Sequence, residues 1–333
     1  MELLIWSLIF AVSVAALLIG AAWFSAAASR FLSKAAAAEF AAIAVGAALP
    51  ELALALAAVL SDRPELVLPI VLGSSVANIF LVAGASAAAA KNLPIVRECA
   101  EAEAPLLAGS AAILWFCAAD GVVLFEEGLL MVAAFLICAV FLASQERING
   151  FTPRDIVAPG FLSAGRGLVE IVGARFGRGF GGRPKNTAGA LLRGMAGAVL
   201  LALAAVFAIE ALTGIAKLLA ISSVLLAFSV LAVAAALPEI WSSLKIIAKK
   251  RYELVMGNVF SSVAVNVLLV TGVAAMFSPL PVGGAAAEVG LPFFAAAAAL
   301  LTVSGFSRKI SSGQGWLYLF LYLLFWAKLF QIF

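Results

Sequence analysis

Residues 46–67 read GAALPELALALAAVLSDRPELV, and residues 234–255 read AAALPEIWSSLKIIAKKRYELV. The two stretches align without gaps at an offset of 188 residues, and the alignment continues into GSSVAN and SSVAVN, which begin at residues 73 and 261. A chance match in an alanine-rich chain would align Ala and Leu, whereas this match aligns Pro, Glu, Ser and Asn. The sequence therefore contains an internal repeat, and each copy is expected to be one structural unit.

The composition indicates what surrounds this repeat. Of 333 residues, 65% are hydrophobic and 12% are charged, against roughly 45–50% and 25% in soluble domains. Lipid accommodates so much apolar surface and water does not, so most of the chain is expected to be transmembrane helix. A net charge of +3 is too small to indicate a nucleic-acid partner. The sequence has no histidine, which removes the commonest transition-metal ligand and general base.

Apolar runs separated by charged residues or Gly/Pro clusters predict ten transmembrane helices, and most runs exceed the roughly 17 residues that a helix needs to cross. The predicted ranges are 3–27, 36–60, 66–90, 104–119, 122–143, 188–213, 218–247, 253–277, 287–305 and 315–333. With both termini outside, 18 of the 21 lysines and arginines fall on the inner side. This bias is the one that the positive-inside rule requires. We expect a multi-pass protein of the cell (inner) membrane.

The ten helices divide into two halves of five. The first half spans 1–143 and the second spans 188–333, and a basic, glycine-rich cytoplasmic loop over 144–187 joins them. The repeated motif occupies the second and third helices of each half. Five is an odd number, so the halves enter the membrane in opposite directions. Such an inverted repeat places a binding site at the midplane between the halves.

Two glutamates, Glu51 and Glu239, lie at equivalent repeat positions inside apolar helices. An ionised carboxylate costs several kcal/mol there, so a purely structural role requires each to be protonated and hydrogen-bonded. Two carboxylates that meet at the midplane repel each other unless a cation or protons neutralise them. A divalent cation matches the charge of the pair.

Each glutamate follows a proline, which removes one helical hydrogen bond and is expected to break the helix. Carbonyls freed near such a break can bind cations. The expected carbonyl ligands belong to Gly46, Ala47, Ala234 and Ala235.

Two side chains on the next helix of each half, four in all, offer neutral oxygens for the same cation. They form two pairs at i, i+4 spacing, so each pair shares one helix face. The pairs are Ser74 with Asn78 and Ser262 with Asn266. For the two serines, a role in close helix packing is the competing interpretation.

Together these segments resemble the alpha repeats of the calcium:cation antiporter superfamily, the sodium/calcium exchangers and their microbial relatives. The resemblance implies that Glu51 and Glu239 are the central cation-binding glutamates. It implies second-helix ligand positions at Ser74, Asn78, Ser262 and Asn266. Separations of 23 residues from Glu to Ser and 27 from Glu to Asn are identical in the two halves.

The chain also departs from the family pattern. Two hydroxyl residues precede Pro-Glu in the family, where they help to form sodium sites, but here they are Ala47 and Ala48 in the first half and Ala235 and Ala236 in the second. The acidic residue often found at the position of Asn266 is also absent. Dependence on sodium is therefore an open question.

The leading hypothesis is a secondary antiporter that exchanges a divalent cation, most simply Ca²⁺, for Na⁺ or H⁺ by alternating access. The alternatives are the same fold with another cation, a transport-deficient relative, a membrane scaffold, and an intramembrane enzyme. No catalytic or cofactor-binding residue is predicted. The expected partners are inorganic cations and the lipid bilayer, and the oligomeric state stays open.

Overall fold

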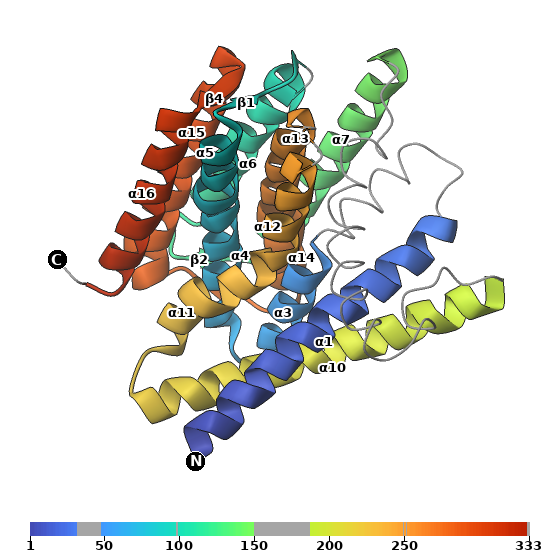
Figure 1. The fold of residues 1–333 in the computed structure, drawn as a ribbon. Helices are drawn as coiled ribbons and strands as arrows, with labels where there is room; N and C mark the ends of the chain where they lie inside the picture. The colour runs from blue at the N-terminus through green and yellow to red at the C-terminus, as the bar shows by residue number, and fades with distance from the viewer. Residues whose placement is uncertain (32–47, 98, 150–186, 249, 251, 332–333) are drawn as a thin grey trace.

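The computed structural model describes residues 1–31, 48–97, 99–149, 187–248, 250 and 252–331 (Figure 1). Within these residues the chain forms ten helical segments, five in each half. The first half contains α1 (Glu2–Phe31), α3 (Leu49–Leu60), η1 (Pro64–Leu66), α4 (Val67–Val76), η2 (Ala77–Ala83), α5 (Gly84–Ala90), β1 (Asn92–Pro94), η3 (Cys99–Glu103), α6 (Ala104–Cys117), β2 (Val122–Val123) and α7 (Phe125–Asn149). The second half contains α10 (Thr187–Leu219), α11 (Ser223–Leu226), η4 (Ala227–Leu231), α12 (Ala232–Ala248), α13 (Glu253–Val265), η5 (Asn266–Val270), α14 (Thr271–Phe277), β3 (Leu280–Pro281), η6 (Ala286–Gly290), α15 (Leu291–Ser307), β4 (Lys309–Ser311) and α16 (Ser312–Leu329).

This architecture confirms the predicted all-α fold, because the strands have only two or three residues each. Five described helices are long and apolar enough to cross a membrane by length and composition. They are Glu2–Ala28, Pro64–Ala90, Thr187–Leu219, Val255–Phe277 and Ala286–Ser307. The second predicted helix, 36–60, is described only from residue 48 onward. Residues 150–186 of the predicted loop lie outside the described part.

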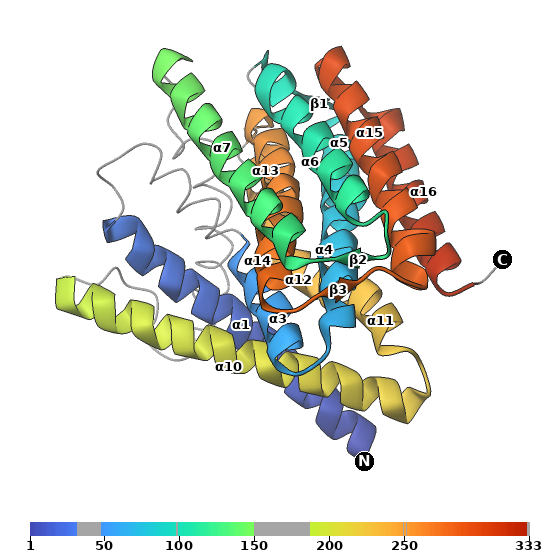
Figure 2. The ribbon, with the colours of Figure 1, turned by 180° about the vertical axis from the view of Figure 1, so that it is seen from behind.

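The offset of 188 residues extends beyond the motif to the whole of each half. Adding 188 to the residue numbers of β1, β2, η3 and α6 gives those of β3, β4, η6 and α15 to within two residues. The strands pair between the halves, β1 with β4 and β2 with β3, both antiparallel. Figures 1 and 2 show the two pairs at opposite ends of the bundle. The inverted repeat therefore relates the two opposite ends of the helix bundle.

The helices that contain the motif form the centre of the bundle. In the most apolar window of Pro64–Ala90, 94% of the residues are buried, and the corresponding share is 83% in Val255–Phe277 but only 28% in Glu2–Ala28. α4 packs against α12, η4 and η5, all of which belong to the second half. First-half and second-half residues thus share one core.

Helices α1 and α10 form a pair that crosses the other helices obliquely (Figures 1 and 2). They run antiparallel, since Gly194 near the start of α10 contacts Ala27 and Gly214 near its end contacts Trp6. Between these points, a Cβ on Gly20 would lie 2.9 Å from the carbonyl oxygen of Gly197. The backbones touch there, as small residues allow in membrane helix pairs.

Two sequence predictions are wrong, one about the end of a helix and one about a break inside a helix. The helix predicted over 188–213 continues to Leu219, and the gap predicted before 218 lies inside α10. A Cβ on Gly214 would lie 2.7 Å from the Trp6 ring, so the absence of a side chain at this position makes room for the ring. The helix continues through Gly214. The break expected at Pro238 is also absent, since α12 stays helical from 232 to 248. The irregular turn of this helix is η4, which precedes α12. The hydrogen bond that Pro238 cannot make is tolerated because other helices pack around α12.

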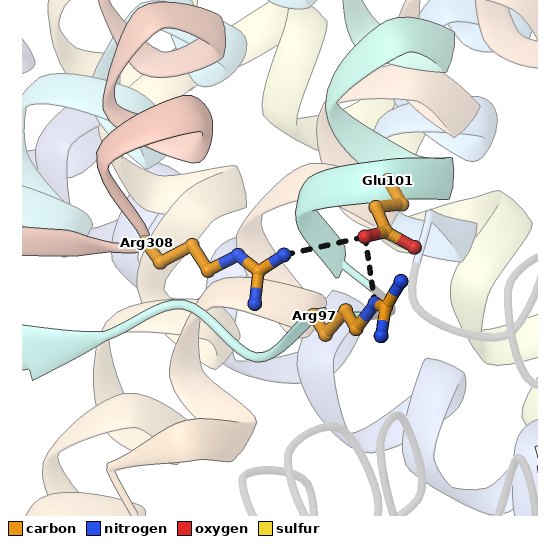
Figure 3. Close-up of polar contacts among 3 residues, drawn as sticks. All are labelled: Arg97, Glu101 and Arg308. Carbon is orange, nitrogen blue, oxygen red and sulfur yellow. Dashed lines mark hydrogen bonds and ion pairs between the residues drawn. The ribbon is translucent and has the colours of Figure 1, made fainter.

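An ion-pair cluster joins the halves at the β1·β4 end of the bundle (Figure 3). Glu101 Oε1 lies 2.7 Å from Arg97 Nε and 3.3 Å from an Arg308 guanidinium nitrogen. All three side chains are more than half exposed. The repeat-equivalent positions at the β2·β3 end are Ala285, Val289 and Asp120, so the cluster has no counterpart there.

Candidate cation-binding site

The two repeat glutamates lie in the interior, one from each half. Glu51 is in the first turn of α3, which begins at Leu49 with Pro50 in its first turn. Glu239 is in the middle of α12. The Glu51 side chain is 0% exposed and that of Glu239 is 4% exposed. The helices that carry them, α3 and α12, both pack against α4. The structure therefore buries both members of the pair that the sequence predicts.

The serines and asparagines come from the two central helices. Ser74 and Ser262 lie in α4 and α13, and Asn78 and Asn266 lie in the π-helical turns that follow them. All four side chains are buried. η2 begins one residue before Asn78, and η5 begins at Asn266. Such π turns often mark functional positions, because the extra residue per turn changes where a side chain points.

A hydrogen bond between the halves connects two of these residues. The Asn266 Nδ2 donates to Ser74 Oγ at 3.3 Å, and Ser74 Oγ donates to the Val71 carbonyl oxygen at 3.2 Å. The helix that carries Glu51, α3, packs against η5, which begins at Asn266. Asn78 approaches the second half because η2 packs against both α12 and α13. The predicted side-chain ligands thus lie on helices and π turns of the two halves that pack against each other.

Several oxygens of this group have no hydrogen-bond partner among the described residues. They are both carboxylate oxygens of Glu51, the side-chain oxygens of Asn78 and Asn266, and Ser262 Oγ. Buried polar atoms in native proteins are nearly always hydrogen-bonded, so a cluster of unpartnered oxygens calls for an explanation. Carboxylate, amide and hydroxyl oxygens are the ligands that Na⁺ and Ca²⁺ accept. The arrangement is chemically suited to a hard cation.

The predicted carbonyl ligands divide between described and undescribed parts of the chain. Ala234 and Ala235 are buried in α12, and Pro238 offers no amide hydrogen to the Ala234 carbonyl. Gly46 and Ala47 lie outside the described residues. The family's hydroxyl residues are replaced by Ala47, Ala48, Ala235 and Ala236, and the three of these that are described, Ala48, Ala235 and Ala236, are 2%, 0% and 0% exposed.

Sequence reasoning missed four further buried polar residues near the motif. They are Ser75, Ser243, Asn258 and Thr271. Their repeat partners are Val263, Ala55, Ile70 and Ala83. A search for identities between the two copies passes over positions where only one half is polar. A helical spacing of four residues from Glu239 and from Ser262 is the signal that would have found Ser243 and Asn258.

Fold and site together define a class, the membrane transporters built from two inverted halves around a midplane site. Residues 5–143 and 190–331 match the sequence model of a family described as sodium/calcium exchanger protein. The chain belongs to that family and is a multi-pass membrane cation antiporter, not an enzyme.

Individual relatives agree with this assignment. The protein named as antiporter CaxA from Alkalimonas amylolytica is 26% identical over 277 residues, which cover 82% of this chain and 81% of that protein. A structure of the sodium-calcium exchanger NCX_Mj, soaked with 2.5 mM Na⁺ and 0.1 mM Ca²⁺, matches 96% of this chain and 97% of that one. Its TM-score is 0.62 at 20% identity. A second NCX_Mj structure, soaked with 2.5 mM Na⁺ and 10 mM Sr²⁺, matches with a TM-score of 0.60 at 19% identity. At these identities the two structures establish the fold alone.

Proposed function

We propose that this antiporter exchanges a divalent cation, Ca²⁺, for Na⁺ or H⁺ by alternating access at a site between Glu51 and Glu239. The observation that supports the proposal is the burial of two carboxylates, one from each half, on helices that both pack against α4. Two like charges in a low-dielectric interior require compensation. One Ca²⁺, two Na⁺ or two protons each supply it, and this equivalence is the basis for exchange.

The remaining ligands in this proposal are neutral. Asn78 and Ser262 contribute oxygens that have no partner among the described residues. Asn266 and Ser74 are already hydrogen-bonded to each other. Carbonyls at Gly46, Ala47, Ala234 and Ala235 complete the proposed set. Because only Glu51 and Glu239 are charged, the site matches a divalent ion or its monovalent equivalents.

The counter-ion follows from what the site lacks. With alanine at 48 and 236, no side-chain hydroxyl precedes either Pro-Glu pair, so a dedicated sodium site would depend on backbone carbonyls. We therefore propose weak dependence on Na⁺ and a larger contribution of protons. We also propose that both termini are outside, that loop 144–187 is cytoplasmic, and that the protein lies in the cell (inner) membrane, as the distribution of lysine and arginine predicts.

Transport into proteoliposomes tests the proposal. Purified protein is reconstituted, and ⁴⁵Ca²⁺ uptake is followed with an outward Na⁺ gradient, an outward proton gradient, or neither. Uptake above that of protein-free liposomes under one of the gradients is expected. The double variant Glu51→Gln with Glu239→Gln, which keeps the shape of both side chains, is the matched control and should show no uptake. Uptake of other cations but not Ca²⁺ would favour altered selectivity, and no flux of any cation would favour a transport-deficient relative.

A further inference from the structure

Many buried hydroxyls of the described helices fall into two groups. One group donates to a carbonyl three or four residues back in its own helix, the usual arrangement for Ser and Thr in helices. This group contains Ser74, Ser110, Thr213, Ser229, Ser261 and Ser304. The other group has no hydrogen-bond partner among the described residues, and it contains Ser25, Ser75, Ser243, Ser262 and Thr271. Ser243 is the member of the second group that shares a helix with Glu239, and it is 2% exposed. A helical serine that does not bond back is oriented toward something else.

Ser243 lies one helical turn after Glu239 on α12, and residues at i and i+4 share a helix face. α12 packs against α13, where Asn258 is also 2% exposed. Asn258 lies four residues before Ser262 and eight before Asn266, so all three follow one stripe of that helix. Two polar side chains outside the predicted ligand set therefore extend the rows of predicted ligands on neighbouring helices.

The two residues also lie at the same depth. Four residues separate α12 from α13 in the sequence, and Ser243 is five residues before the end of α12 while Asn258 is five after the start of α13. At a rise of about 1.5 Å per residue, each lies roughly 7.5 Å from the end of its helix. They are therefore on the α12–α13 side of the glutamate pair, which is the cytoplasmic side in the proposed orientation.

The first half has no equivalent of this pair. The repeat partners of Ser243 and Asn258 are Ala55 and Ile70, and both are fully buried. The inverted repeat places equivalent residues on opposite sides of the site. The polar pair Ser243 and Asn258 therefore lies on one side, and the apolar pair Ala55 and Ile70 lies on the other. A role limited to folding would not require such a difference between two otherwise matched helix pairs.

We propose that Ser243 and Asn258 form an additional oxygen subsite for the transported cation, one turn from Glu239 toward the α12–α13 end. This inference rests on the proposed function. The side-chain oxygens of both residues are neutral, hard ligands suited to Ca²⁺ and Na⁺. Without a carboxylate of its own, the subsite holds a cation weakly, as a position occupied on the way between the glutamates and the cytoplasm.

Sided transport measurements on Ser243→Ala test the subsite. Concentration dependence of ⁴⁵Ca²⁺ flux is measured with Ca²⁺ presented on either face, in right-side-out and in inverted membrane vesicles. With Ca²⁺ on the α12–α13 side, the half-saturating concentration should rise about three- to tenfold, the scale of one lost polar contact to an ion. With Ca²⁺ on the opposite side it should change by less than about twofold.

Ser261→Ala is the matched control, because it removes a buried hydroxyl from α13 that already donates to the Gly257 carbonyl at 2.8 Å. It should leave the half-saturating concentration unchanged on both sides. Ser243→Cys keeps the side chain's size and replaces the hard oxygen with a soft sulfur. It should reproduce the Ser243→Ala shift, and it serves as the test if the alanine variant does not fold.

The possible outcomes distinguish a failure of this inference from a failure of the proposed function. Normal wild-type exchange with no shift in either Ser243 variant, or with equal shifts on both sides, contradicts the subsite alone. Absence of Ca²⁺ transport in the unmodified protein contradicts the proposed function and the subsite with it. A shift confined to the α12–α13 side, with Ser261→Ala unchanged, supports both.

Discussion

Asn266 donates a 3.3 Å hydrogen bond to Ser74 across 192 residues of sequence, joining the second half of the molecule to the first. The repeat-equivalent residues, Asn78 and Ser262, make no such bond, and their side-chain polar atoms have no partner among the described residues. The sequence symmetry is therefore broken at the site. One Ser–Asn pair is bonded within the protein, and the other keeps its oxygens available for a ligand.

This difference predicts unequal effects of two equivalent substitutions. Ser74→Ala removes the acceptor of the Asn266 amide and should lower stability, since leaving a buried polar group unsatisfied costs about 1–3 kcal/mol. Ser262→Ala removes a hydroxyl without a partner and should leave the apparent melting temperature of the cation-free protein almost unchanged. Thermal unfolding in detergent without Ca²⁺ measures both. Equal melting temperatures in the two variants would show that the bond contributes nothing.

Charge removal at the glutamates should separate transport from folding. Glu51→Gln or Glu239→Gln alone should abolish Ca²⁺ exchange, because one remaining carboxylate cannot neutralise a divalent cation. Each variant should stay folded and match or exceed the wild-type melting temperature without cations, since an uncompensated buried charge is costly. Flux assays and thermal unfolding on the same preparations measure the two properties. Wild-type flux in both single variants would remove these residues from the site.

The sequence predicted the parts of this fold that depend on repeated chemistry. Pro-Glu and Ser/Asn motifs predicted Glu51 and Glu239 as a pair, and the structure buries both, on helices that pack against α4. The choice of which Ser–Asn pair is bonded could not be predicted, because both copies offer the same side chains. The β1·β4 and β2·β3 pairs were missed as well, since two or three residues are too few to show an alternating pattern.

Long-range packing also escaped prediction for physical reasons. The gap predicted between residues 213 and 218 contains Gly214, and only the Trp6 ring, more than two hundred residues earlier, explains why the helix continues there. Pro238 resembles a break, and only the helices packed around α12 explain why it is tolerated. Such partners lie in other segments, so local sequence patterns do not reveal them.

Sodium dependence should respond to the two alanines before the Pro-Glu motifs. Ala48→Ser combined with Ala236→Ser restores a hydroxyl in each half, at positions that are already buried beside the glutamates. We expect Na⁺-driven ⁴⁵Ca²⁺ uptake to rise relative to proton-driven uptake in the same liposomes. Steep, saturable activation by Na⁺ in the unmodified protein would show that backbone carbonyls suffice.

The Glu101 cluster should matter little for stability (Figure 3). All three of its side chains are more than half exposed, and exposed ion pairs contribute about 0–1 kcal/mol. Glu101→Gln should therefore shift the melting temperature only slightly, with a smaller shift at high salt because salt screens the wild-type pairs. A series of melting curves across ionic strength measures this. A large loss that does not depend on salt would show that Glu101 has a structural role beyond these pairs.

Close packing beside the site should make Gly73 intolerant of any side chain. A Cβ there would lie 2.7 Å from the Phe228 carbonyl oxygen and 2.6 Å from the Ala232 Cβ, so α4 would have to move away from η4 and α12. Overpacking of this kind costs about 1–3 kcal/mol, and it would displace Ser74, the next residue, from its bond with Asn266. Gly73→Ala should therefore lower both the melting temperature and Ca²⁺ flux. Gly109→Ala is the matched control, since nothing lies within 4 Å of its added methyl group, and it should be neutral or mildly stabilising as a helical Gly→Ala change. Equal behaviour of the two variants would show that α4 and α12 are free to separate without affecting the site.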